Sequence, residues 1–246
     1  MPKLIYQPKG KAREYSPWAC NLYNGCSNRC EYCYNRHGIA APLLGRDTPI
    51  LKAGATVEQF KIELQKYKER IIEDGKGLFF NFVSDPFLED TFELNMECAK
   101  IALREKVPCV FLSKCRVPMQ MISMFMKHIH KVKVGFTLTG FDEVEPGADS
   151  NAQRIAEINA LHTCGISTWA SIEPVISIDQ SIQMIDKAYR AGCREFKIGL
   201  LSGKKPYKAK NVAAMKYYID KKYGNTCDIY WKDSVTKYID HDTKAI

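Results

Sequence analysis

One stretch of the sequence shows the fold pattern most clearly: residues 132–172 read VKVGFTLTGFDEVEPGADSNAQRIAEINALHTCGISTWASI. Apolar runs at residues 132–139 and 168–172 are of the kind that forms buried strands. Between them Ser150 can cap a helix, and Gly165 can end it. The helix carries apolar residues on one face, at Ile155, Ile158 and Leu161. The stretch therefore predicts a strand, a helix and a second strand in succession.

The same alternation extends to both sides of this stretch. Thr56 and Gln59 can form a capping box at the start of a helix over residues 56–75, whose apolar residues follow the spacing of one buried face. We predict further strands at residues 17–23, 78–83, 109–113 and 195–201, with 228–231 as a candidate last strand. We predict further helices at residues 92–106, 118–131, 180–191 and 209–223.

Alternation of strands and helices at this interval predicts right-handed βαβ units around a parallel sheet. Either an open doubly wound sheet or a full or partial barrel fits the pattern. No linker, low-complexity run or exact repeat interrupts the sequence. We therefore predict a single domain over residues 1–246, with irregular ends at 1–16 and about 202–246. A chain of this length can bury most of the apolar surface of one α/β barrel.

The composition, 46% apolar and 26% charged, is that of an ordinary globular protein. No apolar run approaches the roughly 18–20 residues that a membrane-spanning helix needs. The N-terminus lacks the apolar stretch of a signal peptide, so we expect a cytoplasmic protein with no membrane partner. Ten cysteines in a reducing cytosol are poor candidates for disulfides, and they favour metal binding or catalysis instead.

Positive charge is concentrated near the C-terminus. Residues 1–186 hold 22 Lys and Arg against 22 Asp and Glu, whereas residues 187–246 hold 14 against 6, which accounts for the net charge of +8. The run KKPYKAK at residues 204–210 places lysines around one tyrosine and suits phosphate contact with base stacking. Such a segment can attract nucleic acid or an acidic partner, or it can be a solvated surface that aids solubility.

The cysteine-rich segment at residues 23–34, YNGCSNRCEYCY, is the most informative for function. Its C-x3-C-x2-C spacing lets three thiols converge on one inorganic centre, and turn-forming residues favour a loop after the first strand. A structural zinc site needs four ligands, and Cys20 or His37 could supply the fourth. Three cysteines also suit a [4Fe–4S] cluster, in which they leave one iron open for a cofactor or substrate.

This spacing, with an aromatic residue before the last cysteine, resembles the signature of the radical S-adenosylmethionine (SAM) superfamily. The resemblance implies that Cys26, Cys30 and Cys33 hold a [4Fe–4S] cluster whose open iron is chelated by SAM. Electron transfer then cleaves SAM to methionine and a 5′-deoxyadenosyl radical. Tyr32 stands at the family's aromatic position and would lie against the adenine. The resemblance also implies an external electron donor of flavodoxin or ferredoxin type.

Four further motifs make the sequence similar to the spore photoproduct lyase-like branch, also labelled DNA repair photolyase-like. They are Ser84-Asp85-Pro86, Leu112-Ser113-Lys114, Glu145-Pro146-Gly147-Ala148 and Ser171-Ile172-Glu173-Pro174. The similarity runs over about residues 15–202 and implies the superfamily's partial (β/α)6 barrel, with the active site at the C-terminal ends of the strands. Residues 203–246 then form a basic C-terminal extension.

Polar side chains at those strand ends are candidates for SAM contacts, because parallel α/β proteins bind ligands there. Ser84 could hydrogen-bond the SAM amino group, and Lys114 could pair with its carboxylate. Thr137 and Glu173 would face the same mouth, able to bond the methionine or the ribose hydroxyls. The ordinary alternatives are a turn opener for Ser84 and a snorkelling surface lysine for Lys114. Two other residues are assigned structural roles, a helix cap for Asp85 and a surface or loop-bracing position for Arg154.

One departure from the lyase pattern concerns the hydrogen-atom donor. The lyase carries a cysteine two residues before its Ser-Asp pair, and this chain has Phe82 there. The change puts thymine-dimer reversal by the lyase route in doubt. Cys109 or Cys115 could donate instead only if folding brings one of them beside the substrate. The Gly-Gly-Glu stretch of many radical SAM enzymes is also absent, with Ser84-Asp85-Pro86 in its place.

The leading hypothesis is an enzyme of lyase or oxidoreductase type whose 5′-deoxyadenosyl radical abstracts a hydrogen from a nucleic-acid or nucleotide substrate. A second is a radical SAM enzyme that modifies a protein or peptide, or activates a partner by forming a glycyl radical. A third is a zinc-stabilised nucleic-acid-binding module, which would leave the long run of βα units without a task. The sequence leaves the catalytic residues and the oligomeric state open.

Overall fold

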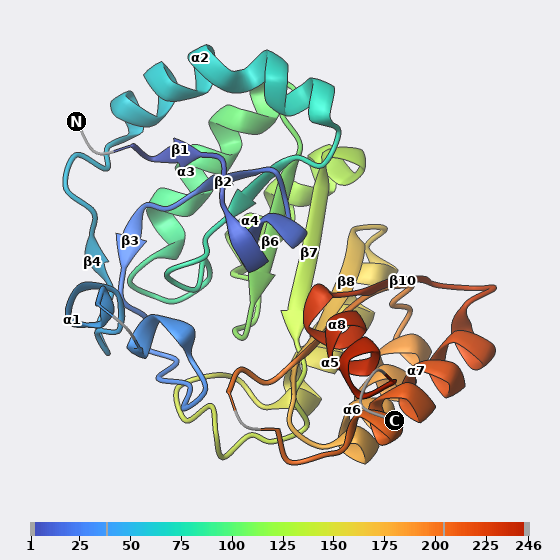
Figure 1. The fold of residues 1–246 in the computed structure, drawn as a ribbon. Coiled ribbons are helices and arrows are strands. Elements are labelled where there is room, and N and C mark those ends of the chain that lie inside the picture. Colours follow the sequence, from blue (N-terminus) through green and yellow to red (C-terminus); the bar gives the residue numbers. More distant parts are fainter. Residues whose placement is uncertain (1–2, 38, 204, 244–246) are drawn as a thin grey trace.

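The computed structural model of the protein describes residues 3–37, 39–203 and 205–243 (Figure 1). Across these residues the main sheet has the strand order β1-β2-β5-β6-β7-β8-β9-β10. Its strands are β1 (Ile5–Tyr6), β2 (Trp18–Cys20), β5 (Leu78–Phe80), β6 (Cys109–Ser113), β7 (Val132–Thr137), β8 (Ser167–Val175), β9 (Glu195–Leu200) and β10 (Asp228–Trp231). β1 runs antiparallel to β2, and all the other neighbours are parallel.

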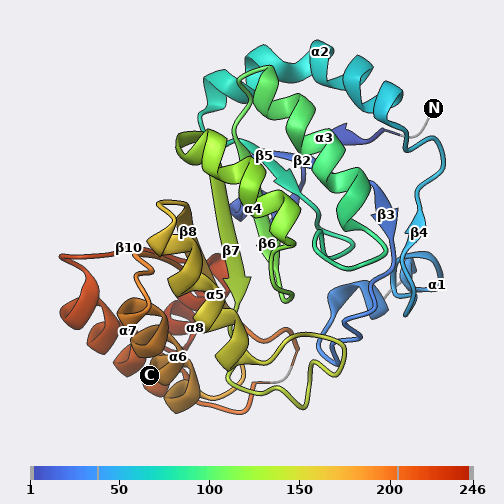
Figure 2. The same cartoon turned by 180° about the vertical axis from the view of Figure 1, so that it is seen from behind.

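Helices connect the successive parallel strands and cover the outer face of the sheet, as the two opposite views show (Figures 1 and 2). They are α2 (Val57–Asp74), α3 (Phe92–Arg104), α4 (Met119–Phe125), α5 (Asn151–Thr163), α6 (Ile178–Arg190) and α7 (Ala209–Tyr223), with α8 (Asp233–Thr243) after β10. A small antiparallel pair, β3 (Tyr23–Asn24) and β4 (Ile50–Leu51), encloses the short helix α1 (Ala41–Leu44) in sequence.

Side chains on the inner face show that the sheet is curled. Ala19 of β2, Phe79 of β5 and Trp169 of β8 pack in one cluster, although β6 and β7 lie between β5 and β8 in the sheet. Tyr15, just before β2, places its ring centroid 5.8 Å from those of both Phe79 and Trp169. The edge strands β1 and β10 are not paired with each other in the described residues. The fold is therefore the α/β partial barrel expected from the sequence.

Capping residues explain where the longer helices begin and end. The Thr56 hydroxyl accepts a hydrogen bond of 3.1 Å from the Gln59 amide at the start of α2. Gly75 ends that helix with a left-handed φ of 68°, which glycine adopts without strain. At α5, Ser150 and Gln153 form a reciprocal capping box. These predicted boundaries are confirmed, and α7 has the predicted bounds.

The structure differs from the sequence expectation mainly at the two ends of the chain. The stretch 1–16, expected to be irregular, contains β1 and a 3-10 helix, η1 (Gly10–Glu14). β1 is held in place because the Leu4 and Ile5 amides donate to the Glu63 carboxylate of α2 at 2.9 and 2.7 Å. Near the C-terminus, α8 packs on α7 and β9.

One predicted helix, over residues 118–131, is divided into two parts. It consists of α4 followed by a 3-10 helix, η3 (Met126–Lys131). The backbone leaves helical geometry at His128, with a φ of −137° and a ψ of 33°. No residue of η3 is buried, so the buried face of α4 ends where this 3-10 segment begins. No helix in the described part of the chain is long and apolar enough to cross a membrane.

Candidate active site

A cavity of about 500 Å³ opens where the parallel strands end. It is lined by segments that follow β3 and β5 and by the C-terminal ends of β6, β7, β8 and β9. The structure brings all eight residues selected from the sequence to this cavity: Cys26, Cys30, Cys33, Tyr32, Ser84, Lys114, Thr137 and Glu173. Side chains from distant parts of the chain therefore share one space, as expected for a site at the mouth of a parallel barrel.

The cysteine loop is fixed at its start by a close backbone approach. The Cys26 amide donates to the Arg46 carbonyl at 2.9 Å. Gly25 has a φ of 84°, and a Cβ at this position would lie 2.6 Å from the Thr48 carbonyl oxygen. Only glycine fits both conditions, because any larger residue would be strained and would collide with backbone. The backbone of Cys26 is thus held by the segment at residues 46–48, without any contribution from a cofactor.

A second loop, residues 144–148, packs against the cysteine loop. The Glu31 amide donates to the Val144 carbonyl at 3.0 Å, and the Gly147 amide donates to the Asn28 carbonyl at 3.1 Å. A Cβ on Gly147 would lie only 2.0 Å from the Ser27 carbonyl oxygen. The glycine of the Glu-Pro-Gly-Ala motif is therefore required because two backbones touch at this point.

A buried ion pair ties the same two loops to the barrel. The carboxylate of Glu145 pairs with the Arg154 guanidinium, and both side chains are fully buried. The Tyr32 hydroxyl donates to the same carboxylate, and Arg154 Nη1 donates to the Thr137 carbonyl at 2.5 Å. Arg154 is therefore the loop brace that the sequence analysis allowed, and the alternative of a surface position is wrong. Its burial requires a paired carboxylate, since an unpaired buried charge is strongly destabilising.

Asp85 braces three loops at once. Its carboxylate accepts from Asn28 Nδ2 at 2.8 Å, from the Ser113 hydroxyl at 2.6 Å and from the Lys114 amide at 2.7 Å. It also accepts from the Phe87 amide at 3.1 Å within its own turn. The suggested role as a cap of the following helix is wrong, because that helix, α3, begins only at Phe92. Asp85 instead holds the cysteine loop and the end of β6 in fixed positions.

Burial keeps the cysteine thiols protonated while no ligand is bound, and a charged lysine lies beside them. Burial raises the pKa of Cys26 to about 12 and also raises the pKa of Cys30. Burial alone would lower the pKa of Lys114, but the surrounding Cys30, Glu145, Asp85 and Cys26 outweigh it and hold that pKa above its ordinary value. Lys114 therefore stays a cation beside the loop. Buried thiols must lose their protons to become ligands, and metal binding supplies the free energy for this step.

The donor set fits an iron–sulfur cluster better than a single metal ion. Among the described residues, no three His, Cys, Asp or Glu side chains lie close enough together to hold one ion. Cys20 is fully buried in the core between sheet and helices, whereas its neighbour Ala19 faces the barrel interior. His37 is exposed and does not line the cavity. Neither residue completes a zinc site, whereas a cluster spreads its cysteine ligands over different irons.

Three of the four residues predicted to contact SAM at strand ends differ in the hydrogen bonds and ion pairs that their side chains make. Ser84 is 6% exposed, and its hydroxyl has no hydrogen-bond partner among the described residues. A buried unpartnered hydroxyl is costly unless a ligand supplies the missing bond. Lys114 Nζ lies 5.7 Å from the centroid of the Tyr32 ring. Glu173 accepts from the Tyr15 hydroxyl and, at 2.7 Å, from Lys232 Nζ, so this carboxylate is already engaged on one side.

Two sequence relatives match a large part of the chain. It is 26% identical over 182 residues to an uncharacterized protein of Methanocaldococcus jannaschii, a match that covers 71% of this chain and 64% of that protein. It is 28% identical over 162 residues to the radical SAM Nα-GlyT isomerase of Pseudomonas phage M6, which covers 63% of this chain and 32% of that protein. The chain thus spans less than two thirds of either relative. No protein-family model matches it.

Solved structures resemble the protein over most of its length. A spore photoproduct lyase mutant superposes with a TM-score of 0.66 and 15% identity, over 91% of this chain and 79% of the lyase. SuiB of Streptococcus suis bound to its precursor peptide SuiA gives 0.65 and 12%, over 87% and 48% of the two chains. A lyase mutant with bound AdoMet and dinucleoside spore photoproduct gives 0.57 and 18%, over 86% and 62%.

The chain has the fold of spore photoproduct lyase and SuiB. In this barrel, three residues that sequence reasoning did not select line or support the cavity: Tyr15, Lys232 and Glu145. Lys232 is 1% exposed and reaches Glu173 from the segment that follows β10. Its sequence neighbourhood carries no motif, and only its place next to an apolar strand end could have suggested a buried role. Glu145 belonged to a recognised motif, and Arg154 was named as a possible loop brace, but the sequence did not show that the two residues form an ion pair.

Position 82, where the lyase pattern has a cysteine, lies inside the cavity. Phe82 lines it and stacks on Phe79, with ring centroids 4.2 Å apart. Of the two alternative thiols, Cys109 is buried in the core, 1% exposed. Cys115 Sγ lies 3.3 Å from Asn28 Oδ1 and does not line the cavity. Neither thiol is thus presented to a substrate, and an aromatic surface replaces the thiol of the lyase pattern.

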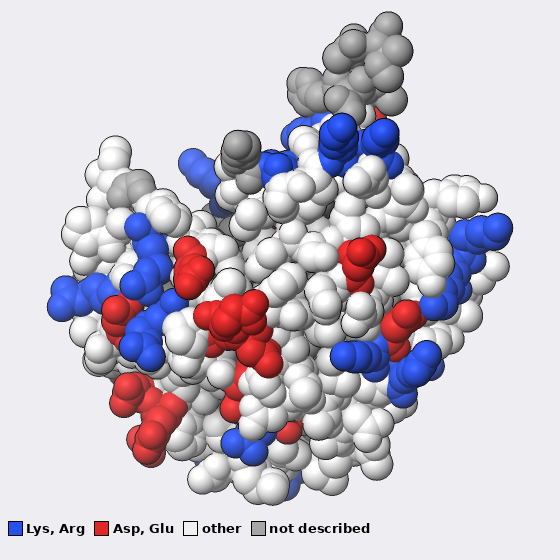
Figure 3. Space-filling view, turned by 90° about the horizontal axis from the view of Figure 1, so that it is seen from below, with Lys and Arg blue, Asp and Glu red and all other residues white. Residues whose placement is uncertain are grey.

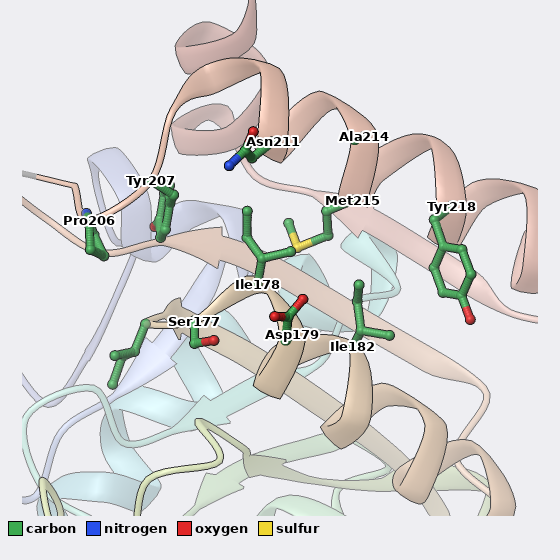
Figure 4. Close-up of a pocket in the computed structure, with 11 residues that line it drawn as sticks. Ser177, Ile178, Asp179, Ile182, Pro206, Tyr207, Asn211, Ala214, Met215 and Tyr218 are labelled. Carbon is green, nitrogen blue, oxygen red and sulfur yellow. The ribbon is translucent and has the colours of Figure 1, made fainter.

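A second hollow, of about 600 Å³, lies between α6 and α7 (Figure 4). Ile178, Ile182 and Met215 point into it, and Tyr207 and Tyr218 stand on its α7 side. No cysteine and none of the predicted site residues lines this hollow. It is near the basic run at 204–210, of which Lys204 lies outside the described residues. All of the predicted site residues therefore lie at the first cavity and none at this hollow.

Proposed function

We propose that the protein is a radical SAM enzyme whose [4Fe–4S] cluster is held by Cys26, Cys30 and Cys33. The observation that carries the proposal is their convergence with Tyr32, Ser84, Lys114, Thr137 and Glu173 on one cavity at the mouth of a radical SAM barrel. When bound, the cluster would supply the electron that cleaves SAM to methionine and a 5′-deoxyadenosyl radical, which abstracts a hydrogen from the substrate.

The chain's own residues would bind and orient the cofactor. The three thiolates hold the cluster on a loop that Gly25, Gly147 and Asp85 fix in position. Ser84 offers a free hydroxyl for a polar group of SAM, and Lys114 offers a charge for its carboxylate. Preorganised groups of this kind lose little entropy when the ligand binds. Electrons would come from an external donor of flavodoxin or ferredoxin type.

For the substrate we propose a nucleic acid or nucleotide. The proposal is supported by similarity to the spore photoproduct lyase-like branch and by the basic C-terminal segment. The substrate radical must then be quenched by a donor other than a thiol at position 82, because Phe82 occupies it. The reaction is therefore expected to differ from that of the lyase in its last step.

A protein or peptide substrate is the second candidate. The observation that favours it is the similarity to SuiB in its complex with the precursor peptide SuiA, at a TM-score of 0.65. The charges that line the cavity weigh against a peptide of ordinary composition, because cations outnumber acids there. We therefore rank it below a phosphate-bearing substrate.

The proposal is tested by the formation of 5′-deoxyadenosine. The protein is reconstituted anaerobically with iron and sulfide, reduced with dithionite and assayed by chromatography with SAM and with DNA, RNA or peptide as substrate. We expect product from the wild type and from Cys164→Ala, whose cysteine is exposed outside the site. We expect none from the triple variant Cys26→Ala, Cys30→Ala, Cys33→Ala. Product at equal rates from this variant would refute the assignment of the ligands.

A further inference from the structure

Positively charged side chains outnumber negatively charged ones in the lining of the first cavity, where the strands end. Seven lysines and arginines line it, whereas only Asp85 and Glu173 contribute carboxylates. Both acids are engaged: Asp85 accepts four hydrogen bonds from its neighbours, and Glu173 pairs with Lys232. A SAM carboxylate at Lys114 would neutralise one further cation. The remaining cations would attract a second anion, such as one carried by a substrate.

Besides Lys114, four of the lining cations have no ion-pair partner among the described residues: Lys9, Lys11, Arg29 and Arg46. All four are exposed at the mouth. Arg36 differs, because its guanidinium pairs with Asp47 at 2.7 Å. Figure 3 views the molecule from below and shows basic side chains on both flanks of the surface, with acidic side chains between them. Unpaired cations around a concave site raise the local concentration of anions.

The N-terminal cations are held in place by their segment. Lys11 Nζ donates to the Ser202 hydroxyl at 3.2 Å, which joins η1 to the loop that follows β9. Glu14, at the end of η1, accepts from the Asp233 amide at 2.8 Å, and Lys197 Nζ donates to its carbonyl at 3.2 Å. Segments from both ends of the chain therefore fix the position of η1 at the mouth. Arg29 and Arg46 line the same cavity, from the cysteine loop and from the segment that follows α1.

An aromatic surface also belongs to this cavity. The rings of Phe79 and Phe82 are stacked, and the Tyr15 ring meets Phe82 edge to face at 6.0 Å. The Tyr34 hydroxyl donates to the Phe82 carbonyl, which keeps a fourth aromatic residue beside them. All four residues line the cavity. Such a surface accepts a planar base of any sequence, because every base has a π-face.

We infer that the cavity holds a phosphate subsite formed by Lys9 and Lys11 on one side and by Arg29 and Arg46 on the other. The occupant is a nucleotide unit of the substrate, with its phosphate between these cations and its base against Phe82. The inference rests on the proposed function, since it assigns to the cluster and SAM the part of the cavity around the cysteines, Ser84 and Lys114. It also assigns a substrate-binding role to the N-terminal segment, which carries no recognised motif.

The test is a titration of the reconstituted protein, with SAM present, by dTMP and by thymidine. These probes differ only in the phosphate and are too small to reach the α7 surface. We expect dTMP to bind about tenfold or more tightly than thymidine, since charge-assisted hydrogen bonds contribute that much. The double variant Lys9→Ser, Lys11→Ser is expected to lose this preference. Arg46→Ser, from the opposite side, is expected to reduce it.

The matched control is Lys208→Ser, Lys210→Ser, which removes the same charge from exposed positions of the chain outside the cavity. It is expected to keep the preference. Equal losses in the two double variants would overturn the subsite, because they would show a general effect of net charge. Equal affinity for dTMP and thymidine, or tighter binding of a tri-glutamate peptide than of dTMP, would also overturn it.

Iron content and SAM binding are measured on the same wild-type sample. A protein that forms the cluster and binds SAM but does not prefer dTMP refutes the subsite and leaves the proposed function intact. A protein that forms no cluster and binds no SAM refutes the proposed function and, with it, the inference.

Discussion

The two sides of the cavity are built in different ways. On the cysteine-loop side, residues 25–33 are held by backbone contacts with residues 46–48 and 144–147, and buried Asp85 and Glu145 complete the brace. On the opposite side, Tyr15, Glu173 and Lys232 come from the N-terminal segment, β8 and the segment after β10. The first side is rigid because backbones touch, and the second depends on side chains from both ends of the chain.

The difference suits the two proposed roles, cofactor binding on the first side and attraction of an anionic substrate on the second. A cluster and SAM need ligands at fixed positions, since misplacement by about 1 Å can cost about 100-fold in rate. Exposed cations at the N-terminal side need less accuracy, because Coulomb attraction varies slowly with distance. Variants on each side of the cavity test this difference, and we give them in decreasing order of expected effect.

The largest effect is expected from Gly147→Ala. The added methyl group would overlap the Ser27 carbonyl oxygen, so that the cysteine loop must move. We expect loss of most of the bound iron and a fall in 5′-deoxyadenosine formation of about 100-fold. Iron analysis and the chromatographic assay measure both. Pro146→Ala, at the exposed neighbouring residue, is the control, and equal iron contents in the two variants would contradict the close approach.

The buried ion pair behind this loop comes next. Glu145→Gln leaves the fully buried Arg154 guanidinium without its counter-charge, and we expect a loss of stability of about 3–5 kcal/mol. Urea unfolding measures it. The double variant Glu145→Gln, Arg154→Met should regain part of this loss, because it removes the unpaired charge. A double variant less stable than the single one would show that the pair is not the main contribution.

On the other side of the cavity, Lys232→Met should have a smaller effect. Glu173 keeps the hydrogen bond from Tyr15 and retains some access to the cavity, so we expect a cost of about 2 kcal/mol. A double-mutant cycle with Glu173→Gln separates the pair from other contacts. A coupling energy near zero would mean that Lys232 contributes only through packing and through its contact with Glu14.

A further prediction, which stands outside this order, concerns pH. Burial and the nearby Lys133, Lys232 and Lys76 lower the pKa of Lys197 to about 8 from its ordinary 10.5. Below pH 8 the folded and unfolded states both bind the proton. Between about pH 8 and 10.5 the unfolded state binds more protons, so stability should rise with pH in this window and level off above it. Thermal unfolding at both limits should show a smaller rise in Lys197→Met, and an unchanged rise would exclude this lysine as its source.

The sequence predicted the cofactor side of the site better than the substrate side. Three cysteines in eight residues and short motifs at strand ends are local signals, and all eight selected residues line the cavity. Their roles remain proposals. Repeated caps such as Ser150 and Gly75 likewise placed helix boundaries. Each of these signals is contained within a few residues of chain.

Other features have no local signal. The contacts of Tyr15 with Glu173 and of Lys11 with Ser202 join residues far apart in sequence. No sequence motif indicates either contact. β1 has only two residues, too few for a periodic pattern, and depends on Glu63 for its position. Asp85 was assigned as a cap of the helix that begins at Phe92, but its carboxylate holds other loops instead. Sequence reasoning fails at these places because tertiary contacts, and not local preference, determine the structure.

The central claim is that Cys26, Cys30 and Cys33 hold a cluster that SAM reaches. It is tested most directly by electron paramagnetic resonance of the reconstituted, reduced protein with and without SAM, together with iron, sulfide and zinc analysis. We predict a reduced [4Fe–4S] signal that changes when SAM is added. The signal should persist in Cys164→Ala and disappear in the triple variant Cys26→Ala, Cys30→Ala, Cys33→Ala. Bound zinc without a cluster, or a cluster signal that SAM leaves unchanged, would contradict the claim.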